Sequence, residues 1–219
     1  MKKLFYVALM GLGLSSAFAQ QADRKVEYGL KVGYTNSNAR WDLSPQVEKG
    51  DATHGYSFGV FAEIPLAEKF SFQPEVLYNE TGFKSKGINV KGYLNQKGGF
   101  AETKRRNISV PLLAKYYVYE GFNFQLGPQV DFLTNSHLKE LWNYPAEGNL
   151  PEEFIGQDRN DNDSMSKVNV GAVVGLGYKL PMGVSFNARY NYGLTNFYDK
   201  KMKDKIKSDV FSFSVGYQF

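Results

Sequence analysis

Two histidines occur in the 219 residues, so nucleophilic or acid–base chemistry has few candidate sites. A hydrolase of the Ser-His-acid type needs an imidazole beside a hydroxyl and a carboxylate. His54, with Asp51 and Ser57 close by in the sequence, has those residue types, whereas His137 lies far along the chain. Combinations of this kind arise freely in polar loops. We therefore expect no enzymatic activity and no catalytic residues.

A second candidate is the acidic stretch QDRNDND at residues 157–163. Asp158, Asn160 and Asn162 place oxygen atoms at alternating positions, as calcium-binding loops do. The stretch departs from an EF-hand loop, because Asp163 stands where the loop needs glycine and Asn169 where it needs glutamate. A solvated loop explains it better than weak calcium binding, and we expect no metal and no cofactor.

Near the C-terminus, five lysines gather in one polar segment: Lys200, Lys201, Lys203, Lys205 and Lys207. The segment is either a solvated loop or, if it faces outward from a membrane, a contact for lipid-A phosphates. The whole chain carries 26 Lys and Arg against 22 Asp and Glu, a balance that gives no indication of nucleic-acid binding.

The first residues resemble a targeting segment. Lys2 and Lys3 precede an apolar stretch at residues 4–14, which is too short to span a bilayer as a helix. Ala17-Phe18-Ala19 then matches a signal-peptidase site. We expect residues 1–19 to be a signal peptide for the general secretory pathway and residues 20–219 to form one domain. The chain has no cysteine, hence no disulfide framework and no lipid-attachment cysteine.

The elements that must position these residues alternate between apolar and polar residues with period two, which predicts strands with one apolar face. The mean hydropathy of −0.40, with no apolar run of about 20 residues, excludes a helical membrane protein. Eight such segments occur, at residues 26–35, 55–64, 70–79, 107–116, 122–132, 168–179, 184–192 and 211–219. No segment after the leader has helical periodicity.

The connections between these segments alternate in length. Short links occupy residues 65–69, 119–121 and 181–183, and long polar links occupy residues 36–53, 82–104, 134–165 and 195–207. Bacterial outer-membrane barrels have short periplasmic turns and long extracellular loops. The pattern therefore predicts an all-β fold, an eight-stranded antiparallel up-and-down transmembrane β-barrel, located in the cell outer membrane.

The size of the side chains on each face predicts which face points outward. One face of each segment is broad and aromatic, and the other is small, polar and rich in glycine. An eight-stranded barrel has an interior only just wide enough for side chains, so the bulky face fits better outside, against lipid. A soluble barrel or sandwich is the alternative. Pro74, Pro111 and Pro128 fall inside predicted strands, and we expect β-bulges or strand irregularities there.

Charged residues on the small face would be enclosed by the barrel. Buried charges require compensation, so we expect a charge and hydrogen-bond network that plugs the lumen rather than a narrow polar pore. The residues with the necessary parity are Lys31, Glu63, Glu75, Lys115, Asp131 and Arg189.

The last strand resembles the C-terminal sorting signal of outer-membrane proteins, which the barrel-assembly machinery pairs as an edge strand. Its aromatic and apolar residues occupy alternate positions: Phe211, Phe213, Val215, Tyr217 and Phe219.

Residues 107–117 (NISVPLLAKYY) and 124–128 (FQLGP) resemble the PorT-like outer-membrane β-barrel family of Bacteroidota. In that family a P-L-L-x-K-Y strand, a tight turn and a G-P strand form a characteristic hairpin. Residues 29–34 (GLKVGY) and 74–78 (PEVLY) are similar to its first and third strands. The resemblance implies the barrel fold but no particular activity. One branch of the family assists a protein-secretion system.

Three functions remain open. The first is a structural, anchoring or accessory protein that contacts another envelope protein through its long loops, where Trp142 and Tyr144 lie. The second is a narrow pore for small solutes, and the third is a lipid-modifying enzyme. We expect a monomer that contacts outer-membrane lipid, including lipopolysaccharide, and the assembly machinery during biogenesis.

Overall fold

The structure, a computed structural model, describes residues 25–43, 46–49, 51–86, 99–144, 153–160, 162, 165–198 and 206–219. The predicted signal peptide lies outside the described residues, as do Lys200, Lys201, Lys203 and Lys205. Within those ranges, no helix is long and apolar enough to cross a membrane.

Every regular secondary-structure element in the described part of the chain is a β-strand. Its strands are β1 (Glu27–Leu43), β2 (Gln46–Lys49), β3 (Asp51–Pro65), β4 (Phe70–Lys86), β5 (Gly99–Tyr119), β6 (Phe122–Tyr144), β7 (Glu153–Asn160), β8 (Val168–Lys179), β9 (Val184–Gly193) and β10 (Ile206–Gln218).

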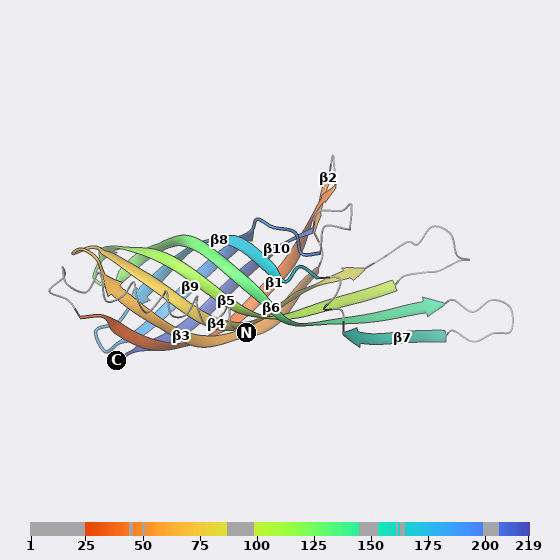
Figure 1. Cartoon of the computed structure of the whole chain (residues 1–219), viewed down its shortest axis with the longest axis horizontal. Helices are drawn as coiled ribbons and strands as arrows, with labels where there is room; N and C mark the ends of the chain where they lie inside the picture. The colour runs from red at the N-terminus through yellow and green to blue at the C-terminus, as the bar shows by residue number, and fades with distance from the viewer. Residues whose placement is uncertain are drawn as a thin grey trace.

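Eight of these strands close into an antiparallel barrel (Figure 1). Neighbours in the wall follow the order β10-β9-β8-β6-β5-β4-β3-β1, and β1 pairs back onto β10 from Gly29↔Gln218 to Trp41↔Ile206. Closure leaves no exposed edge in the wall, which a strand structure needs in a bilayer. The predicted eight-stranded up-and-down barrel is confirmed.

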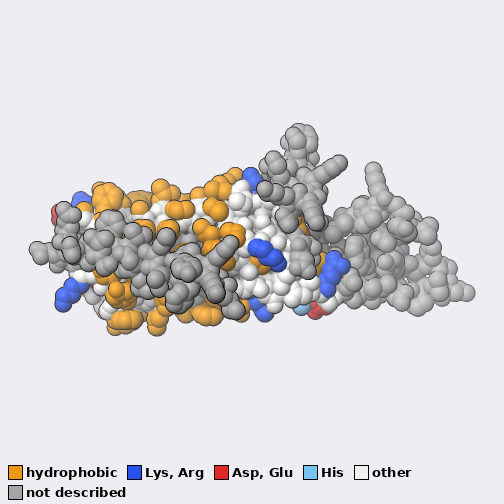
Figure 2. All heavy atoms as spheres, in the orientation of Figure 1, with side chains coloured by type: hydrophobic (Ala, Val, Ile, Leu, Met, Phe, Trp, Pro, Cys, Tyr) orange, Lys and Arg blue, Asp and Glu red, His pale blue; other side chains and the backbone are white. Residues whose placement is uncertain are grey.

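Apolar side chains cover the outside of the barrel and polar ones fill the inside. In β1, Leu30 and Val32 are 57% and 62% exposed, whereas Lys31 between them is 3% exposed. Figure 2 shows the resulting hydrophobic surface over the barrel wall. A soluble barrel would have the opposite arrangement. The exposed face is therefore the lipid-facing one.

Short turns join the strands at one end of the barrel. Glu120 and Gly121 link β5 to β6 with φ values of 29° and 87°. A two-residue hairpin loop of type I′ needs positive φ at both positions, and its twist matches that of the flanking strands. Residues 66–69 and 180–183 make the other short links. By the loop-length rule for bacterial barrels, this end is periplasmic.

At the other end, the predicted long loops begin as strands. The links predicted at residues 82–104 and 134–165 contain the ends of β4, β5 and β6 and all of β7. These segments pair as a four-stranded sheet, which we call the outer sheet: residues 84–86, 99–104, 137–144 and 153–160. Figure 1 shows it continuing past the barrel. The link predicted at residues 36–53 likewise contains the end of β1, β2 and the start of β3.

The three intra-strand prolines produce no bulge, but each lies at or beside an interruption of a ladder, so only the expected strand irregularity is present. Pro74 pairs with Leu112 and Pro111 with Gln129, and the register is the same on both sides of each interrupted ladder. A proline removes one ladder hydrogen bond without changing the residue count, so the strands stay aligned. The register shifts lie elsewhere, between Ala52 and Ser57, Arg106 and Asn107, and Tyr117 and Tyr119.

Candidate functional site

Glu75 is the centre of an ion network that crosses the barrel lumen. Its carboxylate accepts a hydrogen bond from Lys31 Nζ at 2.6 Å and two from the Arg189 guanidinium at 2.8 Å each. The three side chains are buried, and they reach the centre from β1, β4 and β9. A bidentate arginine and a lysine supply the compensation that a carboxylate needs inside a membrane protein.

A second group lies closer to the short-turn end and is connected to the first. Lys115 Nζ donates to Glu63 at 2.8 Å and to Gln73 Oε1 at 3.0 Å, and Gln73 Nε2 donates to Glu75 at 2.5 Å. Tyr117 also donates to Glu63. The structure thus brings together five of the six residues predicted for the lumen: Lys31, Glu63, Glu75, Lys115 and Arg189.

Asp131, the sixth, lies outside this network. Its carboxylate accepts a hydrogen bond from Gln129 Nε2 at 2.8 Å, and among the described ion pairs none involves it. It lines a chamber of about 60 Å³ in the outer half of the lumen, with Arg105, Asn107, Asn169 and Arg189.

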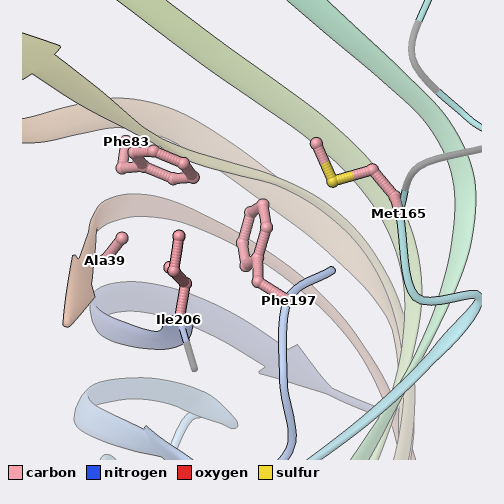
Figure 3. Close-up of a cluster of buried hydrophobic side chains, with 5 residues drawn as sticks. All are labelled: Ala39, Phe83, Met165, Phe197 and Ile206. Carbon is pink, nitrogen blue, oxygen red and sulfur yellow. The ribbon is translucent and has the colours of Figure 1, made fainter. Parts of the chain in front are cut away.

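An apolar cluster covers the chamber at the long-loop end, and we call it the plug (Figure 3). Five buried side chains form it: Ala39, Phe83, Met165, Phe197 and Ile206. The Phe83 and Phe197 rings meet edge to face with their centroids 5.2 Å apart. Because these residues come from β1, β4, β10 and two connecting segments, the plug ties opposite sides of the mouth together.

Arg105 joins the plug to the chamber. Its guanidinium lies 4.2 Å from the centroid of the Phe197 ring and donates to Asn169 Oδ1 at 2.8 Å and to Ser166 O at 3.0 Å. Arg105 lies on β5, on the long-loop side of the last lipid-facing apolar residue, Ile108, and so outside the membrane-spanning part of the strand. Burial lowers the pKa of Arg105 to about 10, while the nearby Asp131 carboxylate acts in the opposite direction. Arg105 is therefore cationic at neutral pH.

The short-turn end holds an open, charged vestibule of about 520 Å³. Glu63 and Tyr117 line it together with Lys25, Glu27, Glu68 and Lys179. Lys179 pairs with Glu27 across the β1 and β8 ends. The vestibule thus ends at the Glu63–Lys115 part of the ion network.

The structure does not bring His54 and Ser57 together as a Ser-His-acid site would require. His54 is exposed on the outer face of β3, whereas Ser57 is buried on the inner face. His54 Nδ1 instead contacts the Tyr34 hydroxyl and the Asn36 amide, and its ring stacks on Tyr34 with centroids 5.7 Å apart. We call the band of exposed apolar side chains around the barrel the apolar belt. The Tyr34–His54 pair lies at its outer end, where amphipathic aromatic rings are favoured.

The acidic stretch is extended rather than wrapped around a cation. Asp158 and Asn160 belong to β7, and Asp158 pairs with His137 of β6. Asn162 Oδ1 accepts a hydrogen bond from the Ser136 backbone N–H at 2.6 Å. Asp163 lies outside the described residues, and the part that is described contains no cluster of three metal-ligating side chains.

The C-terminal strand completes the barrel wall. β10 lies between β9 and β1, and the Phe219 backbone N–H donates to Tyr28 O at 2.9 Å. The residues of the predicted assembly signal all expose their side chains on the outer face: Phe211, Phe213, Val215, Tyr217 and Phe219.

Sequence reasoning missed the plug and several polar partners in the lumen. Phe83, Met165 and Phe197 stand as isolated apolar residues in segments predicted to be polar loops. An apolar residue in such a loop is the available signal for an inward fold. Gln73, Gln125 and Gln218 have the lumen-facing parity but no charge, so a search for charges passes over them.

Comparisons with solved structures give small barrels. Neisserial surface protein A is 14% identical, with a TM-score of 0.48 over 90% of this chain and 100% of that one. Ail, the attachment invasion locus protein of Yersinia pestis, in complex with sucrose octasulfate, is 14% identical, with a TM-score of 0.46 and the same coverage. OprG from Pseudomonas aeruginosa is 14% identical, with a TM-score of 0.42 over 91% of this chain and 98% of that one.

A search of curated proteins gives no match. A family model described as "Outer membrane protein beta-barrel domain" matches residues 18–199, most of the chain. The match agrees with the closed barrel and its lipid-facing exterior, and it places the protein in the outer membrane. The chain belongs to the outer membrane protein beta-barrel domain family.

Proposed function

We propose that this protein is a non-conducting outer-membrane anchor that acts through its exterior, as an accessory or receptor for another envelope component. The observation that carries the proposal is the double obstruction of the lumen. The plug occupies the outer mouth and the Glu75 network crosses the middle, with a chamber of only about 60 Å³ between them. A hydrated ion would have to displace both layers to pass.

The outer sheet supports the second half of the proposal. It continues the barrel wall beyond the apolar belt through β4, β5, β6 and β7, where Trp142 pairs with Gly99 and Ile155. A sheet that grows directly from barrel strands has a fixed position relative to the membrane. Surface segments held by a rigid scaffold are where binding residues concentrate.

Recordings in planar bilayers test the obstruction. Purified protein should give no conductance steps, and wild-type steps of constant size would contradict the proposal and favour the narrow pore. One variant combines Lys31→Met, Glu75→Gln and Arg189→Gln with Phe197→Ala, which removes the central ion pairs and the Phe197 ring of the plug and so weakens both layers. Because the proposal attributes the closed lumen to these side chains, this variant should give conductance steps.

Affinity capture from native outer membranes tests the accessory role. The informative variant joins Lys139 to Asp158 through an Asn-Gly turn, which removes the outer parts of β6 and β7 and leaves the barrel intact. Its matched control replaces Glu120 by Asn in the short turn at the other end. A partner retained by the wild type and the control, and lost with the shortened hairpin, supports the proposal. Equal recovery of every protein by all three would refute it.

We also propose that the chain is a PorT-like member of its family, on the resemblance carried by the hairpin of β5 and β6. The segments that carry the resemblance, residues 107–117 and 124–128, pair with each other around the Glu120-Gly121 turn. A captured partner from a secretion machine would support membership in the secretion-assisting branch of that family, and a partner from another envelope system would oppose it.

A further inference from the structure

Two ion pairs lie on β4 and β5 beyond the apolar belt, and in each pair the two partners differ in how far they are exposed to solvent. Arg106 Nε lies 3.3 Å from Glu80 Oε2, and the arginine side chain is 50% exposed while the carboxylate is 10% exposed. Lys104 Nζ lies 4.0 Å from Glu102 Oε1, with exposures of 45% and 18%. In both pairs the cation faces outward and the acid is recessed. The Lys179–Glu27 pair at the opposite end has the reverse order.

The height of Arg106 matches that of lipid headgroups, and Lys104 lies two residues farther out on β5, beside the outer edge of the headgroup layer. Arg106 is the first outward residue of β5 beyond Ile108, which pairs with Tyr78 at the end of the apolar belt. Two residues of a strand tilted by about 40° rise about 5 Å, so Arg106 lies about 5 Å and Lys104 about 10 Å above the belt. The headgroup layer of each leaflet is about 5–8 Å thick.

The backbone at Arg106 is held in place. The register shift between β5 and β6 falls here and gives β6 one additional residue, Thr134. The Thr134 hydroxyl donates to the Arg106 carbonyl oxygen at 2.6 Å. Acids limit the patch on either side, since Asp51 lies opposite Lys84 in the register of β3 and β4, and Asp158 forms an ion pair with His137. Figure 2 shows basic side chains where the hydrophobic surface ends.

We infer that Arg106 and Lys104 form a binding site for the phosphate group of an outer-leaflet lipid. A ligand that carries a phosphate above acyl chains meets both the cations and the apolar surface directly below them, where Val76 is exposed. Free phosphate or an acidic peptide would use the cations alone. The inference is independent of the proposed anchor role, because a conducting barrel would present the same outer surface.

Native mass spectrometry of the detergent-solubilised protein tests the site. The probes are diphosphorylated lipid A and the same lipid with its phosphates removed. The variant is the double substitution Lys104→Gln and Arg106→Gln, and the control is Lys69→Gln, an exposed lysine in a short turn at the other end. Heat-modifiable electrophoretic mobility verifies that each variant is folded.

The wild type and the Lys69→Gln control should prefer the phosphorylated lipid. The double variant should weaken its binding by about fivefold for each cation removed, with no change for the dephosphorylated lipid. Inorganic phosphate at the same concentration should not compete. An unchanged preference in the double variant would overturn the inference, as would an equal loss in the Lys69→Gln control. Competition by inorganic phosphate or by an acidic peptide at that concentration would also overturn it.

Discussion

Replacing Glu75 by Gln removes the anion that two buried cations share. Lys31 and Arg189 both remain, and their side chains are almost fully shielded from solvent. Arg189 keeps its 2.6 Å hydrogen bond to Gln125 Oε1, but the Lys31 ammonium loses the carboxylate 2.6 Å away. Removing one partner of a buried ion pair costs about 3–5 kcal/mol, because the remaining charge stays desolvated. We expect Glu75→Gln to lower the free energy of unfolding by this amount.

Equilibrium unfolding by urea in lipid bilayers, followed by circular dichroism, measures the loss. Asp131→Asn is the matched control, since this carboxylate has no ion pair among the described residues, and it should change stability by less than about 1 kcal/mol. Adding Lys31→Met to Glu75→Gln removes one stranded cation and should restore at least about 1 kcal/mol. A Glu75→Gln variant as stable as the wild type would refute the role of the shared carboxylate, as would a double variant less stable than the single one.

Three further substitutions test other parts of the structure. Phe197→Ala opens a cavity in the plug at a local cost of about 3–5 kcal/mol, so the Ser166 amide should exchange faster with deuterium, while bilayer recordings should stay silent. Gly127→Ala should lower urea stability although alanine ordinarily favours a strand by about 0.5–1 kcal/mol, because a Cβ here collides with the Leu112 carbonyl oxygen. Leu126→Arg should cost about 2–4 kcal/mol in bilayers, and no cost there would place this exposed side chain away from lipid.

The strands of the barrel were predictable because burial differs between their two faces. Leu30, Lys31 and Val32 alternate in type since lipid lies on one side and a narrow polar lumen on the other. The outer sheet lacks that contrast. Residues such as Lys84, Glu102 and Asp158 carry no apolar period, so their strands read as polar loops.

The sequence predicts which side chains point into the lumen, but it does not predict how far along the barrel axis each one lies. Parity along a strand predicts that Glu75 and Asp131 both point inward, and both do. The pairing partners depend on how the strands are staggered around the barrel, which the sequence of one strand does not contain. Glu75 therefore meets Arg189 from β9, while Asp131 lies in the chamber nearer the mouth. The plug depends on the same three-dimensional information.

The direction of the side chains in β10 gives the most direct test of the whole account, and the absence of native cysteines makes single-cysteine labelling simple. Phe213 is exposed on the outer face, and its neighbour Ser212 lines the chamber. Nitroxide labels at Phe213→Cys and Ser212→Cys, in protein reconstituted in bilayers, report collisions with oxygen dissolved in the lipid. We predict frequent oxygen collisions at position 213 and few at position 212. The opposite order would mean that the apolar face points inward, and it would contradict the account.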